Sequence, residues 1–434
     1  MVRRQFCRRT ATDGPVLLAS TDKRGWRIVA LLFLGILVNY IDRGNLSVAA
    51  VPIMRDLGVS PAAMGTLLSA FFWTYTALQL PAGYLVDRLN LKWTYGAAFL
   101  LWSLASGAMC FAHSFSQILA LRLVLGIGEA VAVPASLAYI RNHFPPEQRG
   151  LPTGIYVSGM MFGPALGNFL GGFLLSQLSW RHLFLLTGLG GCFWLLPWLL
   201  VAPDREARDP SGSSQTMVTA DWKRLLVLPT FWGITLGSFC YSYYWSFFLT
   251  WLPSYLVLQR RLSFLRMGAY TALPLVAMAV IAPISGRWAD RLNSRSGSSL
   301  GTRKTFTCGG FLLGGLVLFI VVVNSPLVLL GILLFSTAGL GLASANYWTI
   351  TQEFAPPGLI GRFIGYQNMV ANLAGICAPA LTGFIVDRTK DFNLSLFLAG
   401  GALPAAAVAY LALVREADVR AVRSLPFQAS LRPD

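Results

Sequence analysis

Four ionisable residues stand within hydrophobic stretches, where charge is energetically costly. Asp42 and Arg43 are consecutive in "GILVNYIDRGNLSVAA", and Arg122 and Glu129 are seven residues apart in "LRLVLGIGEAVAVPA". Seven residues make almost two helical turns, so Arg122 and Glu129 are predicted to share one helix face, about 10 Å apart along the axis. A guanidinium binds a carboxylate through two parallel hydrogen bonds, and a carboxyl group held away from water can exchange a proton near neutral pH. These residues therefore indicate anion binding close to proton exchange.

A structural interpretation of the same four residues is the alternative. Asp42–Arg43 and Arg122–Glu129 would then be internal ion pairs that hold two helices together. The two interpretations overlap, because an arginine released from an internal pair can bind the carboxylate of a substrate. Ionisable residues within membrane spans normally face a bundle interior or a water-filled cavity. We expect Asp42 and Arg43 to place a protonatable acid directly beside an anion-binding base.

The composition indicates that the elements carrying these residues lie in a bilayer. The chain has 434 residues, of which 55% are hydrophobic and only 12% are charged, with a mean hydropathy of +0.60. Soluble proteins contain about 25% charged residues. Windows of about 20 residues predict twelve membrane-spanning helices. The predicted helices begin near Trp26, Pro61, Trp93, Phe115, Leu151, His182, Pro229, Met267, Thr305, Pro326, Phe363 and Leu394.

The distribution of basic residues predicts the topology. The formal net charge is +16, and most Lys and Arg fall in segments on the same side of the membrane as the N-terminus. Basic residues gather on the cytoplasmic side of membrane proteins, so both termini are expected there. This asymmetry explains the charge without nucleic-acid binding. The apolar core "PVLLA" of the N-terminal segment is too short for a signal peptide, and the six cysteines form neither a CxxC motif nor a metal-site pattern.

The sequence repeats itself weakly in two halves. "GYLVDR" (Gly83–Arg88) is echoed by "GRWADR" (Gly286–Arg291), "HFPPEQRG" by "EFAPPGLIGR", and "GPALGNF" by "APALTGF". A polar stretch rich in Ser and Pro separates the halves, and duplicated six-helix halves are typical of alternating-access transporters. We therefore predict a cytoplasmic tail (1–25), a six-helix bundle (26–202), a cytoplasmic linker (203–228), a second six-helix bundle (229–414) and a cytoplasmic C-terminal tail (415–434).

These motifs resemble a known group of transporters. "GYLVDRLNLK" is similar to a loop signature of the major facilitator superfamily. "NYIDRGNLSVA", "LRLVLGIGEAVAVPA" and "FFLTWLPSYL" resemble its anion:cation symporter family, which includes bacterial sugar-acid transporters. The resemblance extends from about Trp26 to Val414. It implies an all-α membrane protein with twelve transmembrane helices in two pseudo-symmetric six-helix bundles.

The resemblance also implies roles for single residues. Asp42 and Glu129 match the proton-linked carboxylates of the family, Arg122 matches its substrate-anion ligand, and Tyr40, Tyr75 and Asn372 match binding positions. Three further candidates for substrate binding come from the sequence itself. Arg43 adjoins Asp42, Gln79 shares a helix face with Tyr75, and Tyr244 lies in the aromatic stretch "FCYSYYWSFFLTW". Helix packing is the alternative role for such aromatic residues.

A third set of residues is predicted to act in gating. They lie at the cytoplasmic ends of helices, in or near the repeated loop signature, where they would latch one conformation without contacting the substrate. They are Gly83, Asp87, Arg88, Asp290, Arg291, Glu353 and Arg362.

The sequence therefore predicts a monomeric secondary transporter in the inner (plasma) membrane that takes up a small organic anion with protons and has no other cofactor. A sugar acid is the first candidate substrate. Sugar-acid members often carry "GIFNSG", whereas this chain has "GIYVSG" with Val157, so a less hydroxylated carboxylate is the second. "SGMMFGPALGNFLGG" resembles a signature of antiporters, which leaves anion exchange or efflux as the alternative. A receptor or an enzyme is the remote alternative, and the chain carries no HExxH motif.

Overall fold

The computed structural model of the chain describes residues 23–144, 150–203, 222–296, 299–355 and 360–424, and within them it contains helices and no strand. The N-terminal half comprises α1 (Lys23–Val48), α2 (Ala50–Leu57), α3 (Pro61–Arg88), α4 (Leu91–Ala108), η1 (Met109–Phe111), α5 (Phe115–Glu129), α6 (Ala132–His143), α7 (Gly150–Gln177), α8 (Trp180–Phe184), η3 (Leu185–Leu189), α9 (Gly190–Cys192) and α10 (Leu195–Val201).

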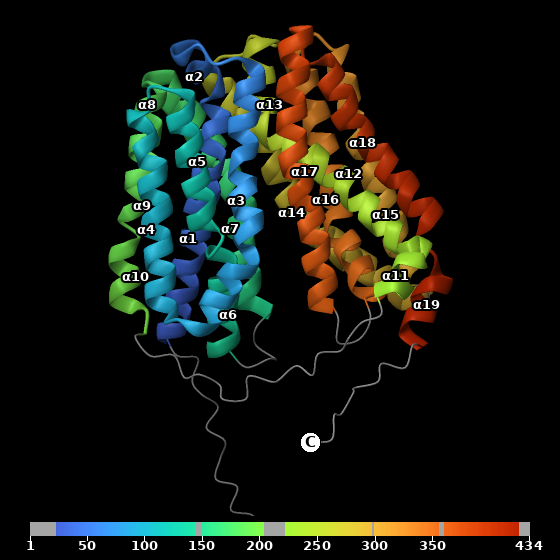
Figure 1. Cartoon of the computed structure of the whole chain (residues 1–434). Coiled ribbons are helices and arrows are strands. Elements are labelled where there is room, and N and C mark those ends of the chain that lie inside the picture. Colours follow the sequence, from blue (N-terminus) through green and yellow to red (C-terminus); the bar gives the residue numbers. More distant parts are fainter. Residues whose placement is uncertain (1–22, 145–149, 204–221, 297–298, 356–359, 425–434) are drawn as a thin grey trace, which may run out of the picture.

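The C-terminal half comprises α11 (Trp222–Val227), α12 (Pro229–Thr250), α13 (Leu252–Leu258), α14 (Phe264–Ser296), α15 (Ser299–Gly314), η4 (Gly315–Val321), α16 (Pro326–Phe354), α17 (Ile360–Thr389), α18 (Asn393–Leu413) and α19 (Glu416–Ser424). The two halves form two helical bundles that lie side by side (Figure 1). Each predicted span begins at the start of an observed helix or within six residues of it, the largest difference being Thr305 against the start of α15 at Ser299.

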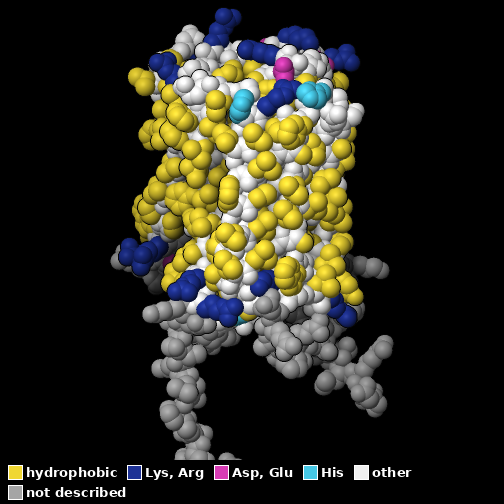
Figure 2. All heavy atoms as spheres, turned by 90° about the vertical axis from the view of Figure 1, so that its left-hand side faces the viewer, with side chains coloured by type: hydrophobic (Ala, Val, Ile, Leu, Met, Phe, Trp, Pro, Cys, Tyr) yellow, Lys and Arg dark blue, Asp and Glu magenta, His cyan; other side chains and the backbone are white. Residues whose placement is uncertain are grey.

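Ten helical segments of the described chain are long and apolar enough to cross a membrane. The helices α3 and α12 have 28 and 22 residues, and their Trp, Tyr, Ser and Thr side chains lower their hydropathy. They are the candidates for the remaining two of the twelve predicted spans. Figure 2 shows hydrophobic side chains over the middle of one side of the molecule, with Lys and Arg gathered towards its two ends. This is the surface pattern of a protein that lies in a bilayer.

The bundles meet closely at the end where α2, α8 and α13 lie, which is the upper end in Figure 1. A Cβ atom on Gly65 of α3 would lie 2.5 Å from the carbonyl oxygen of Pro379 in α17, and one on Gly172 of α7 would lie 2.5 Å from that of Phe264 in α14. The hydroxyl of Ser47 also donates to the carbonyl oxygens of Leu249 and Thr250. Small residues let the backbones of membrane helices approach, and here they join the two halves.

The opposite ends of the same helices are apart. Among the described residues, no atom beyond the local helix backbone lies within 4 Å of a Cβ built on Gly83 of α3 or on Gly154 of α7. The ribbons of the two bundles also diverge towards this end, where α6, α11 and α19 lie (Figure 1). The structure is therefore a conformation that is closed at one end of the molecule and separated at the other.

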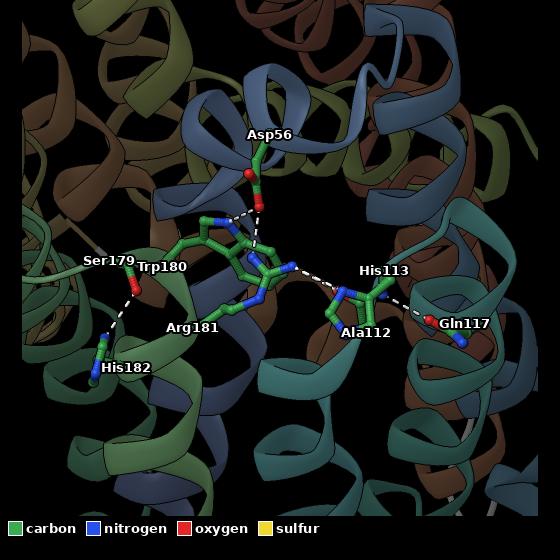
Figure 3. Close-up of polar contacts among 8 residues, drawn as sticks. All are labelled: Asp56, Ala112, His113, Gln117, Ser179, Trp180, Arg181 and His182. Carbon is green, nitrogen blue, oxygen red and sulfur yellow. Dashed lines mark hydrogen bonds and ion pairs between the residues drawn. The ribbon is translucent and has the colours of Figure 1, made fainter.

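A polar cluster stabilises the closed end of the N-terminal bundle (Figure 3). The Asp56 carboxylate accepts hydrogen bonds from Nε1 of Trp180 at 3.0 Å and from Nη1 of Arg181 at 2.5 Å. Nη2 of Arg181 donates to the carbonyl oxygen of Ala112 and lies 3.3 Å from Nδ1 of His113. The hydrogen bonds from Arg181 and Trp180 lower the pKa of Asp56 below its ordinary value. The cluster ties α2, the segment after η1 and α8 together.

The glycines of α7 have a packing role that the sequence left open. A Cβ on Gly159 would lie 2.5 Å from the Ile36 side chain, and one on Gly163 would lie 2.6 Å from that of Tyr40. Gly171 is similarly close to Val48. Because α7 packs along α1 through this row, the row needs no antiporter function to explain it.

We predict that Gly65→Ala destabilises this conformation. The new methyl group collides with backbone atoms of α17 that cannot rotate away, and overpacking of this kind costs about 1–3 kcal/mol. The melting temperature of the purified protein should fall by several degrees. Gly331→Ala is the matched control, because no atom lies within 4 Å of the Cβ position there. An unchanged melting temperature in Gly65→Ala would contradict the close contact between the halves.

Candidate functional site

An ion pair between α1 and α5 forms the centre of the candidate site. The Arg43 guanidinium donates to Oε2 of Glu129 from Nε at 3.0 Å and from Nη2 at 2.8 Å. Nη2 also donates to Oδ1 of Asn39 at 3.2 Å. The side chain of Glu129 is completely buried and that of Arg43 is 15% exposed. Arg43 is therefore the partly accessible member of the pair, and Glu129 is the enclosed one.

Three aromatic rings surround the Arg43 guanidinium. Its Cζ atom lies 4.6 Å from the ring centroids of Tyr40 and Phe71 and 4.8 Å from that of Tyr75. Tyr40 belongs to α1, whereas Phe71 and Tyr75 lie one turn apart on α3 and stack on each other. The faces of aromatic rings attract cations, so these rings hold the guanidinium in place.

Arg122 is a second cation that lacks a carboxylate partner. Its side chain is 2% exposed, its Nε donates to the carbonyl oxygen of Leu67 at 3.3 Å, and its Cζ lies 5.3 Å from the Phe71 ring. Within the described part of the chain it forms no ion pair, and its buried Nη1 has no hydrogen-bond partner. Leaving such a donor unsatisfied costs about 1–3 kcal/mol. An incoming carboxylate would remove this cost and form charge-assisted hydrogen bonds.

Gly126 brings Arg122 and Glu129 against α3. The three residues lie on one face of α5, at intervals of four and three. A Cβ on Gly126 would lie 2.3 Å from Oγ1 of Thr74 and 2.5 Å from the carbonyl oxygen of Phe71. Only a glycine permits this approach of α3 and α5. The helix α5 then ends at Glu129, because Pro134 has no amide to donate to the carbonyl oxygen of residue 130.

The buried carboxylate of Asp42 and the guanidinium of Arg43 have different partners, so the expectation that the acid lies directly beside the base is wrong. Oδ1 of Asp42 accepts hydrogen bonds from Oγ of Ser106 in α4 at 2.8 Å and from Nδ2 of Asn45 at 3.3 Å. Nδ2 of Asn45 also donates to Oγ1 of Thr187 in η3. Consecutive residues of an α-helix are rotated by about 100°, and this rotation directs Asp42 towards α4 and Arg43 towards α3 and α5. The ion pairs Asp42–Arg43 and Arg122–Glu129 are therefore replaced by Arg43–Glu129.

Three of the predicted substrate-binding residues lie further from this centre. Gln79 of α3 accepts a hydrogen bond from Nδ2 of Asn368 in α17 at 3.2 Å, which links the two halves. Asn372 lies one turn further along α17, and its buried Nδ2 has no partner among the described residues. Tyr244 is buried in the C-terminal bundle, where its hydroxyl lies 3.5 Å from that of Ser336. We leave Tyr244 out of the site for this reason.

The predicted gating residues lie at the separated end of the molecule. Arg303, which sequence reasoning missed, contacts Asp290 at 2.6 Å and Glu353 at 3.3 Å. The Arg88 guanidinium lies 5.2 Å from the Tyr84 ring centroid, and Arg291 is exposed at the end of α14. Gly83 has open space around its Cβ position. The side chains of Asp87 and Arg362 lie outside the described residues.

Phe71 is the most important residue of the site that sequence reasoning missed. Its ring contacts both arginines, yet an aromatic residue in an apolar span has no sequence signal that separates it from packing residues. Arg303 stands in "GTRKTF" at the start of a span, where a basic residue is expected from topology alone. Only the fold shows that this residue bridges two acidic side chains.

Comparisons with known proteins agree on one family. The family model described as Major Facilitator Superfamily matches residues 32–379. A D-galactonate transporter of Escherichia coli O6:H1 is 31% identical over 94% of this chain and 100% of its own. A hexuronate transporter of Bacillus subtilis is 32% identical over 89% of this chain and 94% of its own, and a probable galactarate/D-glucarate transporter of E. coli K12 is 29% identical over 94% and 96%.

Solved structures share the same fold. The inward open xylose transporter of E. coli has a TM-score of 0.71 and 16% identity, and the comparison covers 92% of this chain and 100% of the other. A bacterial homologue of the human lysosomal transporter Spinster, in an inward-facing and occupied conformation, has a TM-score of 0.72 and 20% identity, with coverage of 91% and 93%.

Proposed function

We propose, starting from the fact that this chain belongs to the major facilitator superfamily, that it takes up a small organic anion together with protons. The protein is a multi-pass membrane transporter of this superfamily and not an enzyme. The observation that carries the finer proposal is the ion pair between the half-buried Arg43 and the buried Glu129, with a second, buried arginine, Arg122, on the same helix as Glu129. We propose further that it acts as a monomer in the inner (plasma) membrane, with both termini in the cytoplasm.

Anion binding begins in this scheme at Arg122. Its unsatisfied Nη1 and its burial favour a carboxylate as the ligand, because charge-assisted hydrogen bonds are strongest away from water. The aromatic ring of Phe71 lies against both Arg122 and Arg43, so a ligand on Arg122 is close to the second cation. A carboxylate in this position competes with Glu129 for Arg43.

Proton coupling follows from this competition. When Arg43 turns towards the substrate, Glu129 becomes a completely buried carboxylate that has lost its only ion-pair partner among the described residues. An uncompensated buried charge is strongly destabilising, so Glu129 takes up a proton. Anion and proton therefore promote each other's binding, by the reciprocity of linked equilibria.

Asp42 is the candidate for a second proton site. Its carboxylate is 1% exposed, has hydroxyl and amide donors, and forms no ion pair within the described chain. It contacts α4 and the π-helical turn η3 through Ser106 and Thr187. A change of its charge would therefore alter the packing between α1 and these two elements.

The substrate is a carboxylate, and the relatives favour a sugar acid as its class. The printed names of three relatives refer to D-galactonate, hexuronate and galactarate or D-glucarate. Tyr40 and Tyr75, whose rings lie against Arg43, offer hydroxyl groups for the substrate's hydroxyl groups. Gln79 and Asn372 offer amide groups further from the arginines. A less hydroxylated mono- or dicarboxylate stays the second candidate. A thermal-shift screen against a panel of both kinds of carboxylate distinguishes them.

Arg122→Ala should weaken binding of the best carboxylate of that panel by at least about 100-fold, which is about 2.7 kcal/mol. Arg122→Lys should recover little, because a point charge cannot form the bidentate pair. Arg420→Ala is the control, since Arg420 is exposed on α19 and paired with Glu416. Binding by calorimetry at the affinity of the unmodified protein would remove Arg122 from the site.

Glu129→Gln should abolish uptake driven by a pH gradient while retaining substrate binding and exchange. The glutamine leaves Arg43 free for the anion but cannot carry a proton. The measurement is uptake into proteoliposomes at fixed membrane potential, with proton and sodium gradients imposed separately. Full accumulation by Glu129→Gln in a pH gradient would refute its coupling role. Accumulation by the unmodified protein in a sodium gradient alone would refute the proton as coupling ion.

A further inference from the structure

The helices α7 and α14 form a crevice between the two halves. At the closed end their backbones touch, since a Cβ on Gly172 would lie 2.8 Å from Cα of Gly268. Further along, Gly154 of α7 has no atom within 4 Å of its Cβ position, and Gly286 of α14 has only Ala345 of its own half. The two helices therefore diverge from the Gly172–Gly268 contact, and a wedge-shaped space opens between them.

This crevice has a volume of about 650 Å³, and all of its lining side chains are apolar. Two residues of α1, Phe33 and Leu37, contribute to its lining. The complete lining consists of Phe33, Leu37, Phe162, Ala165, Leu166, Phe169, Ala269, Ala272, Leu273 and Val276. Five of these side chains, Phe162, Leu166, Phe169, Leu273 and Val276, are exposed on the surface of the molecule. The crevice therefore reaches the surface of the molecule.

At the depth of the crevice, the outer surface of the bundles faces the hydrocarbon of the bilayer. The lining residues of α7 and α14 fall within the membrane-spanning segments Leu151–Gln177 and Phe264–Asn293. A void with apolar walls loses dispersion contacts when it stays empty, and water finds no polar partner in it. An acyl chain is the apolar molecule that the bilayer supplies at this depth.

A cation stands where the headgroup of such a lipid would lie. Arg266 is exposed near the start of α14, and it precedes Ala269, Leu273 and Val276 at intervals that place all four on one helix face. Its guanidinium forms no hydrogen bond or ion pair within the described part of the chain. Ten residues from Arg266 to Val276 span about 15 Å, which is about half of the hydrocarbon core and the depth available to one leaflet.

We propose that this crevice is a phospholipid site. The lipid belongs to the leaflet at the closed end of the molecule. Its phosphate pairs with Arg266, and one of its acyl chains lies between α7 and α14 against Phe33 and Leu37. Charge and shape thus come from the same face of α14.

The test is the number of phospholipids that the purified protein retains in mild detergent, counted by native mass spectrometry. Ala272→Phe fills the crevice and Arg266→Gln removes the cation, so each variant should retain at least one phospholipid fewer per molecule. Ala97→Phe on the exposed face of α4 and Arg55→Gln at the end of α2 are matched controls and should retain the full number. Ala269→Phe replaces Ala272→Phe if that variant does not fold.

A second measurement reports where the acyl chain of the bound lipid lies. Leu273→Trp places a fluorophore in the crevice, and phosphatidylglycerol with brominated acyl chains quenches it on contact. Quenching should persist after dilution of the lipid with detergent, whereas it should disappear for Leu411→Trp on the exposed face of α18. Equal retention by all variants, or equal loss of quenching at both positions, would overturn the proposal. So would an Ala272→Phe variant that keeps its lipid but loses affinity for the transported carboxylate, since the crevice would then hold part of the substrate.

Discussion

A buried carboxylate at the C-terminal end of a helix needs a positive charge close by. Burial removes its hydration, and the carbonyl dipoles at a helix C-terminus repel it. Glu129 is in this position at the end of α5, and Arg43 supplies the charge from α1. A substrate carboxylate that binds Arg43 therefore leaves the buried charge of Glu129 without a partner. Protonation of Glu129 removes that charge.

The surrounding helices hold Arg43 and Glu129 in position. Gly126 lets α5 approach α3, which places Phe71 and Tyr75 against the guanidinium. The same ring of Phe71 contacts Arg122, so one aromatic side chain orients both cations. At the closed end, glycine contacts such as Gly65–Pro379 hold the halves together, while the opposite ends of the bundles diverge (Figure 1). The pair thus lies in a framework whose two halves can change their relative position.

The sequence predicted the fold well because the hydropathy of the spans is a direct consequence of the bilayer. Helix starts such as Pro61, Phe115 and Pro229 were identified from the sequence, and the repeated motifs indicated the two bundles. The helix breaks near Ala49 and Ala130 and the π-helical turn η3 were not predicted. These breaks depend on which backbone carbonyl groups find a hydrogen-bond donor and on packing against neighbouring helices. Hydropathy averaged over a window of the sequence contains neither kind of information.

The site was predicted only in part, and for an equally physical reason. The charged residues were evident, because charge within an apolar span is unusual. Their pairing was wrong, since neighbours in sequence, such as Asp42 and Arg43, point to different faces of a helix. Phe71 and Arg303 acquire their roles only through helices that are distant in sequence.

The central claim is that anion binding and protonation of Glu129 are one linked event. The direct measurement is the number of protons taken up when the carboxylate binds, obtained by calorimetry in buffers with different ionisation enthalpies. At a pH where unliganded Glu129 is charged, the unmodified protein should take up close to one proton per bound anion, and Glu129→Gln should take up correspondingly fewer. Binding without proton uptake at any pH from 6 to 9, or the same uptake in Glu129→Gln, would contradict the account.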